Sequence, residues 1–314
     1  MARRVRTLGA VAPELRTGFD LVPVPISNRV LLAHVRRQLV AVERPVDGVR
    51  VTRYAVPVPD GTRTLVTLHE PTGEGRPRGA VLWLHGGGTI MGRPEVDHAW
   101  CGRLARELGV LVAAVDYRLA PEHPFPAALD DCLAALHWLR ERLDDPDAPV
   151  RVALGGASAG GLLAAATAQR ALDEGVAGVC FQLLQYPMLD DRTVRRPDHP
   201  ARGRVGWTPR SNRFAWRSYL GHEPGSAIPP AYAVPARRAD LAGLPPAWIG
   251  VGDLDLFRDE STDYAERLAA AGVAVELHVE PRMHHGADVM ADLGVGSMQR
   301  FRQRMVDALD AALG

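Results

Sequence analysis

Residues 151–161 read R-V-A-L-G-G-A-S-A-G-G, an apolar run that leads into Gly156-Ala157-Ser158-Ala159-Gly160. The next residues, L-L-A-A-A-T-A-Q-R-A-L, are typical of a helix. A serine on a sharp strand-to-helix turn needs small neighbours, because the flanking backbones pass too closely for larger side chains. In this context G-x-S-x-G indicates a nucleophilic serine with its Oγ exposed at the helix N-terminus. Elsewhere, Gly-Ser clusters often form plain turns.

Strand and helix patterns alternate on both sides of this turn. Two alternating strands joined at Asp60-Gly61 predict an antiparallel start to a sheet. Later apolar runs suit parallel strands buried on both faces, and between them residues 129–143 and 298–309 repeat apolar positions with helical spacing. The predicted fold class is α/β, with a mostly parallel sheet and helices on both faces. The later runs are residues 80–84, 110–115, 150–154, 179–184, 248–251 and 273–279.

Two segments do not fit this alternation. Residues 1–50 contain helical patches but no strand pattern, and residues 190–235 are rich in Pro, Arg and Trp between two strands. Insertions of this length are usually lids or binding loops. We therefore expect a helical cap, made of 1–50 and 190–235, over a core made of 51–189 and 236–314, with a plain surface insertion as the alternative. The cap should lie over the carboxyl edge of the sheet, where such sheets bind ligands.

Charge and composition narrow the possible partners. Lys plus Arg and Asp plus Glu both total 37, so no basic field exists to hold nucleic acid. The longest apolar runs are too short to span a membrane, and the N-terminal region lacks the apolar run of a signal peptide. A cytoplasmic location is therefore expected.

The cysteines do not predict a metal site or a disulfide framework. Cys101, Cys132 and Cys180 lie far apart, in stretches typical of helix, helix and strand, and we expect them to be reduced core residues. Apart from the adjacent His284 and His285, no paired His or Cys spacing suits a metal ion. Neither a metal nor a cofactor is implied.

A serine hydroxyl needs a base to take its proton and donors to stabilise an oxyanion. The apolar strand A-V-L-W-L ends in H-G-G-G, residues 85–88, where glycines let backbone N–H groups point inward. Gly87 and Gly88, with the N–H of Ala159, are the candidates for an oxyanion hole. A tight turn or a phosphate loop is the alternative, but no G-K-S or G-K-T follows.

The acid and the base have several candidates. Asp253, Asp255 and Asp259 all follow the apolar run A-W-I-G-V-G, and any of them can orient a histidine. In hydrolases with a strand-turn-helix serine the chain order is Ser, acid, His. His284 and His285 both satisfy that order, so spacing alone leaves both choices open.

Several motifs together resemble the hormone-sensitive-lipase family of bacterial carboxylesterases and lipases. Besides H-G-G-G and G-x-S-x-G, the chain has D-Y-R-L-A-P-E-H-P-F-P-A-A-L at 116–129, L-P-P at 244–246 and D-L-F-R-D-E at 255–260. The similarity covers roughly residues 50–290 in consistent order, which is more specific than any single motif.

This resemblance implies an α/β-hydrolase fold and settles the choice of residues. It assigns the acid to Asp255 and the base to His285, which directly precedes a glycine. Asp255 would hold the imidazole tautomer while His285 takes the proton from Ser158. Asp259 then becomes an acid in the first turn of the next helix, and Asp253 a loop residue.

The chain also departs from the family pattern. Ala157 replaces the usual Asp before the nucleophile, and Thr89 and Ala287 stand where aromatic residues are common. These changes leave the candidate triad in place but make the pocket shape and the rate harder to predict. His284 is either a residue lining the pocket or a plain loop residue.

The resemblance implies a serine carboxylesterase that hydrolyses short- to medium-chain esters through an acyl-enzyme intermediate. A small-molecule ester is the expected partner, and a homodimer is left open. Two alternatives remain: a ligand-binding member of the family with weak or no catalysis, and an amidase or peptidase on the same fold. Aromatic residues of 190–235 line an acyl pocket or pack the cap on the core; they are Trp207, Phe214, Trp216 and Tyr219.

Overall fold

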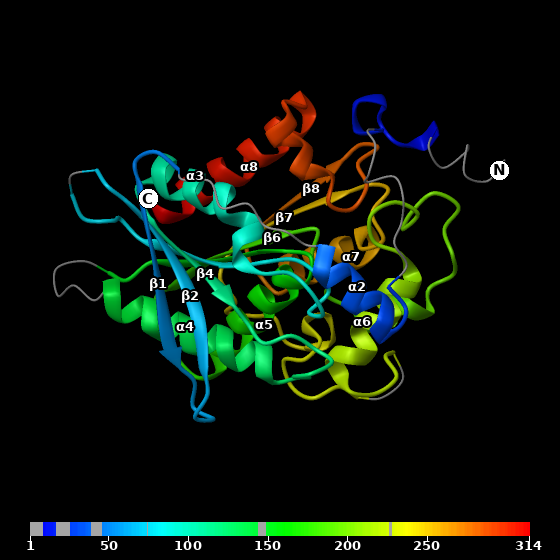
Figure 1. Cartoon of the computed structure of the whole chain (residues 1–314), viewed down its shortest axis with the longest axis horizontal. Helices are drawn as coiled ribbons and strands as arrows, with labels where there is room; N and C mark the ends of the chain where they lie inside the picture. The colour runs from blue at the N-terminus through cyan, green and yellow to red at the C-terminus, as the bar shows by residue number, and fades with distance from the viewer. Residues whose placement is uncertain (1–8, 17–25, 39–45, 74, 144–148, 226–227) are drawn as a thin grey trace.

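The structure is a computed structural model, and it describes residues 9–16, 26–38, 46–73, 75–143, 149–225 and 228–314. Within these ranges a single sheet of eight strands runs through the molecule, in the order β1-β2-β4-β3-β5-β6-β7-β8 (Figure 1). The strands are β1 (Val49–Pro57), β2 (Arg63–Pro71), β3 (Ala80–Leu84), β4 (Leu111–Asp116), β5 (Val152–Ala157), β6 (Val179–Gln185), β7 (Ala247–Gly252) and β8 (Val275–Glu280).

The direction of the strands agrees with the sequence pattern. β1 pairs antiparallel with β2, and β2 pairs antiparallel with β4. From β4 to β8 every neighbouring pair is parallel. The predicted α/β-hydrolase class, a mostly parallel sheet with helices, is therefore confirmed.

Helices cover both faces of this sheet. The longer ones are α2 (Arg29–Gln38), α3 (His98–Leu108), α4 (Ala127–Leu143), α5 (Ala159–Asp173), α6 (Pro209–Leu220), α7 (Arg258–Ala270) and α8 (Gly296–Leu313). Short 3-10 turns are η1 (Pro13–Leu15), η3 (Pro94–Asp97), η4 (Asp191–Arg195), η5 (Pro235–Arg237) and η6 (Ala287–Leu293).

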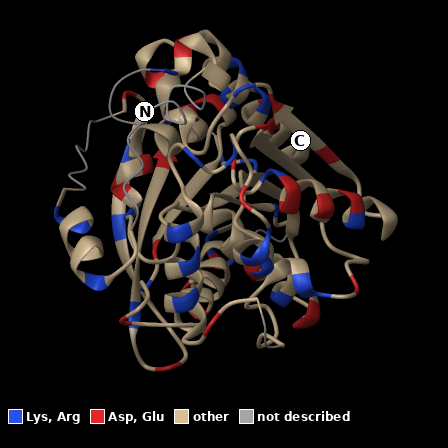
Figure 2. Cartoon of the chain, turned by 90° about the vertical axis from the view of Figure 1, so that its right-hand side faces the viewer, with Lys and Arg blue, Asp and Glu red and all other residues tan. Residues whose placement is uncertain are grey.

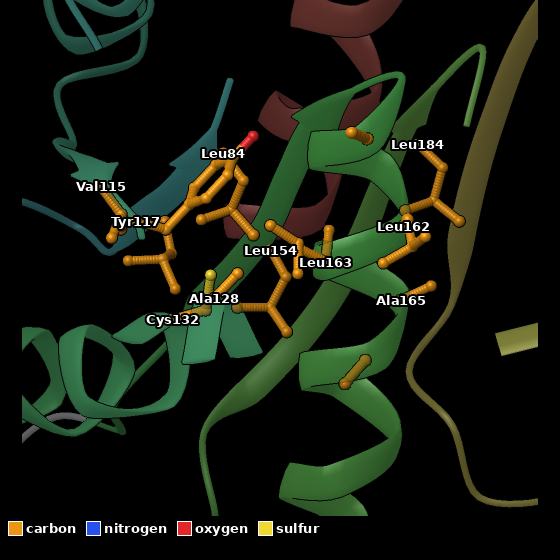
Figure 3. Packing of buried hydrophobic residues seen from close by; sticks show 14 of the residues in the cluster. Leu84, Val115, Tyr117, Ala128, Cys132, Leu154, Leu162, Leu163, Ala165 and Leu184 are labelled. Atoms are coloured by element: carbon orange, nitrogen blue, oxygen red, sulfur yellow. The ribbon is translucent and has the colours of Figure 1, made fainter. Parts of the chain in front are cut away.

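Alternation along each strand divides the core into two layers. In β3, Leu82 and Leu84 pack into the layer beneath α4, α5 and α7, whereas Val81 and Trp83 pack into the layer beneath α3 and α8. Successive side chains of a strand point to opposite faces, so a strand that is apolar throughout feeds both layers. Figure 3 shows the first layer, where leucines of α5 meet Leu154 of the neighbouring strand.

The two proposed cap segments meet on one side of the molecule. α2 and α6 lie close together at that side in Figure 1, and the backbone N–H of Ile26 donates to Ser211 Oγ of α6 at 3.1 Å. Residues 17–25 and 39–45 of the first segment lie outside the described residues. β1 begins at Val49, slightly before the predicted boundary. The division into cap and core remains a prediction.

Two further expectations concern cysteines and charge. The cysteines are free, and Cys101 and Cys132 are buried, but Cys180 is only half-buried, so its placement in the core was wrong. Cys180 is the second residue of β6, and the first two residues of this strand are half-buried whereas the remaining five are buried. Figure 2 shows acidic and basic positions interspersed along the ribbon. No helix in the described ranges is long and apolar enough to cross a membrane.

Candidate active site

The parallel strands bring distant segments to one edge of the sheet. β3, β5, β7 and β8 run in the same direction, so the residues that follow their carboxyl ends gather at the same edge. These are the H-G-G-G loop after β3, Ser158 after β5, Asp255 after β7 and His285 after β8.

Ser158 occupies the sharp turn that the sequence predicts. It is the N-cap of α5, with φ 57° and ψ −113°, a conformation that a non-glycine residue rarely adopts. A Cβ at Gly156 would come within 2.4 Å of the Gly160 carbonyl carbon, and one at Gly160 within 1.8 Å of Leu84 O. Glycine is therefore required on both sides. Hydrogen bonds from Ser158 N to Gln185 O at 2.8 Å and from Met188 N to Ser158 O at 3.0 Å hold the turn.

A chain of hydrogen bonds joins three side chains that are far apart in sequence. Ser158 Oγ lies 3.0 Å from His285 Nε2, and His285 Nδ1 lies 2.7 Å from Asp255 Oδ2. A carboxylate only accepts, so Nδ1–H donates to Asp255 and Nε2 is left to accept the serine proton. This arrangement lets His285 act as a general base toward Ser158.

Burial and a backbone hydrogen bond fix the orientation of the Asp255 carboxylate. Asp255 is 0 % exposed, and its Oδ1 accepts the backbone N–H of Phe257 at 2.9 Å. With both oxygens bound, the carboxylate has one orientation relative to the imidazole. Ser158 is buried, at 5 % exposure, and is not exposed as the sequence predicts, because the glycine loop after β3 packs beside it, whereas the side chain of His285 keeps 10 % of its surface exposed.

Aromatic rings surround His285. Phe257 meets the imidazole edge-on, with centroids 5.2 Å apart and planes at 86°. Tyr186, after β6, lies 4.7 Å away at 62°, and Trp207 of the second proposed cap segment lies 6.4 Å away. The sequence reasoning missed Tyr186 and Phe257, because only the fold brings them to the histidine.

The H-G-G-G loop lies directly beside the serine. A Cβ at Gly86 would be 3.6 Å from Ser158 Cβ. Gly87 has φ 121° and Gly88 φ 63°, and a Cβ at Gly87 would come within 2.0 Å of Met91 O. These backbone conformations favour glycine and keep side chains away from the loop's N–H groups. Ala159, the first residue of α5, adds the N–H of the residue after the serine.

The D-Y-R-L-A-P segment supports this loop, a role that sequence reasoning did not give it. The hydroxyl of Tyr117 donates to His85 O at 2.7 Å, and the rings of Tyr117 and His85 stack 4.2 Å apart. Ala120 N donates to Thr89 O at 2.9 Å. Burial lowers the pKa of His85 to about 4, so this ring stays neutral at ordinary pH. The signal in the sequence was the motif itself, which follows the next strand of the sheet, β4.

The alternative acids and the second histidine occupy other positions. Asp253 N donates to Glu280 O at 3.0 Å in the turn after β7, and Asp259 Oδ1 accepts from Arg202 at 2.7 Å in the first turn of α7. Neither of these carboxylates has a described contact with the candidate base. His284 is buried, with Nδ1 3.0 Å from the carbonyl oxygen of His285, and is therefore part of the loop's packing.

The aromatic residues of 190–235 divide between the two roles that we considered. Trp216 and Tyr219 are fully buried in the core, and Tyr219 packs edge-on against Phe125 at 5.7 Å. Phe214 is half-buried against the same cluster. Trp207 is buried in this cluster too, but it also reaches the site, because a Cβ at Gly88 would lie 2.6 Å from its ring. Trp207 therefore closes over the glycine loop beside His285.

The departures from the family pattern are all buried. Ala157 and Ala287 belong to the same apolar cluster, so small side chains replace both an acid and an aromatic ring at this site. Thr89 has φ 60° and its Oγ1 donates to Gly88 O at 2.6 Å. The site behind the serine is thus apolar and compact.

The chain is similar to known proteins over most of its length. A family model described as alpha/beta hydrolase fold matches residues 81–289. The chain is 38 % identical over 282 residues to Esterase LipI of Mycobacterium tuberculosis, with 88 % of each chain covered. It is 35 % identical over 285 residues to Carboxylesterase NlhH of the same species, again with 88 % of each covered.

A solved structure extends the similarity to almost the whole chain. The crystal structure of esterase LipW from Mycobacterium marinum superposes with a TM-score of 0.84 at 35 % identity. The match covers 97 % of this chain and 96 % of that one. The similarity therefore includes the strands that carry the hydrogen-bonded side chains and the segments over them.

Proposed function

Because this chain belongs to the hormone-sensitive-lipase family of α/β-hydrolases and is a carboxylic ester hydrolase, we propose that it cleaves short- to medium-chain esters through an acyl-enzyme intermediate. The observation that carries this proposal is the 3.0 Å contact between Ser158 Oγ and His285 Nε2. A buried carboxylate, Asp255, is bound to the other ring nitrogen of the same histidine at 2.7 Å.

In the acylation half, Ser158 Oγ attacks the ester carbonyl carbon while its proton passes to His285 Nε2. The carbonyl oxygen becomes an oxyanion, which the N–H groups of Gly87, Gly88 and Ala159 stabilise. When the tetrahedral intermediate collapses, the bond to the alkoxy oxygen breaks and the imidazolium returns the proton to the departing alcohol. Asp255 stabilises the imidazolium through the Nδ1–H bond.

In the deacylation half, His285 removes a proton from water, which attacks the acyl carbon. The second tetrahedral intermediate uses the same donors. Its collapse breaks the bond to Ser158 Oγ, which takes the proton back from the imidazolium, and the carboxylic acid leaves. Besides the ester and water, both halves use the side chains of Ser158, His285 and Asp255 and the backbone N–H groups named above.

The position of Trp207 supports the proposed preference for short to medium acyl chains. Its ring packs on Gly88 and lies 6.4 Å from the imidazole, so it occupies space next to the reacting carbon. Trp207 is 6 % exposed, and its Nε1–H donates to Asn212 Oδ1 at 3.4 Å. A ring held in this way leaves less room for a long acyl chain than an open loop would.

The test is hydrolysis of p-nitrophenyl acetate, butyrate, octanoate and palmitate by the wild type and by Ser158→Ala. We expect the highest kcat/KM on butyrate or octanoate, a steep fall at palmitate and no turnover in the variant. Ser261→Ala is the matched control, because Ser261 is also a buried serine but lies on α7. Wild-type turnover in Ser158→Ala rejects the mechanism, and a maximum at palmitate rejects the size limit.

Two other functions make different predictions for the same protein. A ligand-binding member without catalysis would not react with a fluorophosphonate probe, whereas we expect Ser158 to be labelled. An amidase would cleave butyryl p-nitroanilide at a rate comparable with the ester. We expect the ester rate to exceed the amide rate by a large factor.

A further inference from the structure

An aromatic contact at His285 continues into a buried chain of hydrogen bonds that reaches the C-terminal helix. The ring of Tyr186 lies 4.7 Å from that of His285, with the planes at 62°. The Tyr186 hydroxyl donates to Asp288 Oδ1 at 2.5 Å. Asp288 lies in η6, the short turn that begins directly after the His285-Gly286 dipeptide. Asp288 therefore accepts a hydrogen bond from Tyr186, the residue beside His285, and also belongs to the segment that follows His285.

The second oxygen of Asp288 is fixed to α8. Arg302 Nε donates to Asp288 Oδ2 at 3.1 Å, and its Nη1 donates to Asp292 Oδ1 at 2.8 Å. The guanidinium also lies over the ring of Trp100, 5.4 Å from the centroid. Both side chains of the Arg302–Asp288 pair are nearly closed to solvent, at 9 % and 6 % exposure. Little water competes for these bonds, so their geometry is well defined.

We propose that Tyr186 and Asp288 are positioning residues for His285, an inference that rests on the proposed function. The Tyr186 ring limits the tilt of the imidazole, and the Asp288 carboxylate holds both that ring and the histidine loop in one place. Nε2 must stay in line with Ser158 Oγ through both halves of the reaction, and small displacements of a catalytic group are costly.

The identity of the residues supports this role over simple packing. A phenylalanine would fill the same volume without needing a partner, whereas Tyr186 requires a buried acceptor and Asp288 in turn requires Arg302. Burial, and then the neighbouring Asp288, raises the pKa of Tyr186 well above its usual range, so the hydroxyl remains a donor. The Tyr186 backbone is also in a strained conformation, with φ 35°, held by a 2.6 Å bond from its N–H to Gly250 O.

The test measures kcat and KM on p-nitrophenyl butyrate for Tyr186→Phe, Asp288→Asn and the double variant. We expect each single variant to lose roughly tenfold in kcat, by the cost of misplacing a catalytic group, with KM nearly unchanged. Asparagine has one acceptor oxygen for two donors, Tyr186 and Arg302, so Asp288→Asn weakens the contact that Tyr186→Phe removes. The double variant should therefore lose less than the product of the two.

Tyr264→Phe is the matched control. Tyr264 is fully buried on α7, and its hydroxyl likewise has a side-chain partner, Gln169 Nε2, at 3.1 Å. It makes no contact with the triad in the described structure, so kcat should stay at the wild-type level. Thermal unfolding of every variant checks the fold, and Tyr186→Phe alone carries the test if Asp288→Asn does not fold.

Three results would overturn the positioning role: wild-type kcat in Tyr186→Phe, an equal loss in Tyr264→Phe, or a loss confined to KM. In each of these cases an active wild type that depends on Ser158 leaves the proposed function intact. A wild type that hydrolyses no ester overturns both proposals together.

Discussion

Asp255 Oδ2 lies 2.7 Å from His285 Nδ1, and the same carboxylate accepts the N–H of Phe257 through its other oxygen. The acid is therefore tied to the backbone of its own turn as well as to the base. Asp253, two positions earlier, faces the β8 side of that turn, with its N–H on Glu280 O. This difference allows a direct comparison of the two aspartates.

Asp255→Asn should lower kcat on the order of 10⁴-fold, because an amide can donate to Nδ1 and so favour the wrong imidazole tautomer. Asp253→Asn, the matched control, should change kcat only slightly. Steady-state kinetics on p-nitrophenyl butyrate give both values. A larger loss in Asp253→Asn would transfer the role of acid to that residue.

Gly88→Ala should reduce kcat by at least about 100-fold, the scale of losing an oxyanion donor. Gly88 has φ 63°, and an added Cβ would lie 2.6 Å from the Trp207 ring, so the loop must shift. Gly109→Ala provides the control, since Gly109 has the same φ of 63° but no atom within 4 Å of the added Cβ.

We expect Gly109→Ala to cost about 1–2 kcal/mol of stability, the penalty for a left-handed non-glycine residue, without loss of kcat. Thermal unfolding of both alanine variants measures the stability lost to backbone strain, and their kcat values measure the effect on catalysis. Equal activity of the two would contradict a role for the Gly88 N–H.

Arg36→Ala should lower kcat/KM roughly tenfold, because each hydrogen bond of a charged donor contributes about 1.5–3 kcal/mol to the docking of α2. Arg36 donates to Ile90 O at 2.7 Å and to Ala120 O at 2.9 Å, the two segments that flank the glycine loop. It also binds both oxygens of Glu122 at 2.9 Å.

Arg37→Ala is the control for charge, because Arg37 is the next residue of α2 and is exposed. Limited proteolysis should cut Arg36→Ala near α2 faster than either the wild type or Arg37→Ala. If Arg36→Ala keeps full activity and resistance, then α2 does not support the site through this residue.

His69 should make the fold less stable in acid. Burial, and then the neighbouring His98, lowers the pKa of His69 from 6.5 to about 4. The unfolded chain therefore binds a proton that the folded chain excludes, and the free energy of unfolding falls by roughly 1 kcal/mol per pH unit as pH drops through that window. Burial raises the pKa of Asp97 to about 6, which acts in the opposite direction, so variants must be compared with the wild type.

Urea unfolding at high and low pH tests this effect. The stability gap between wild type and His69→Gln should be largest above the unfolded pKa of 6.5 and shrink as pH approaches 4. His222→Gln, at an exposed histidine, should leave the pH dependence unchanged. A constant gap across this range would show that His69 does not take up the proton.

Local sequence determined much of the fold. The strand before Ser158, the glycines at 156 and 160 and the helix after them are near neighbours in the chain, so their patterns predict the strained turn directly. The all-apolar runs likewise predicted parallel strands, because burial on both faces leaves no polar alternation. The exact ends differed by a few residues, as in β5, which continues to Ala157.

Tertiary structure alone decided which distant residues meet. Nothing in the spacing of Tyr186, Asp288 and Arg302 indicates that they share a buried hydrogen-bond network, and nothing near Arg36 indicates its contact with Ile90. Likewise, spacing left Asp253, Asp255 and Asp259 as equivalent candidates, whereas the turn after β7 brings only the carboxylate of Asp255 to His285 among the described contacts. The physical reason is that periodicity reports which face of a strand or helix is buried, while contacts across the sheet edge depend on strand order and on where each loop turns.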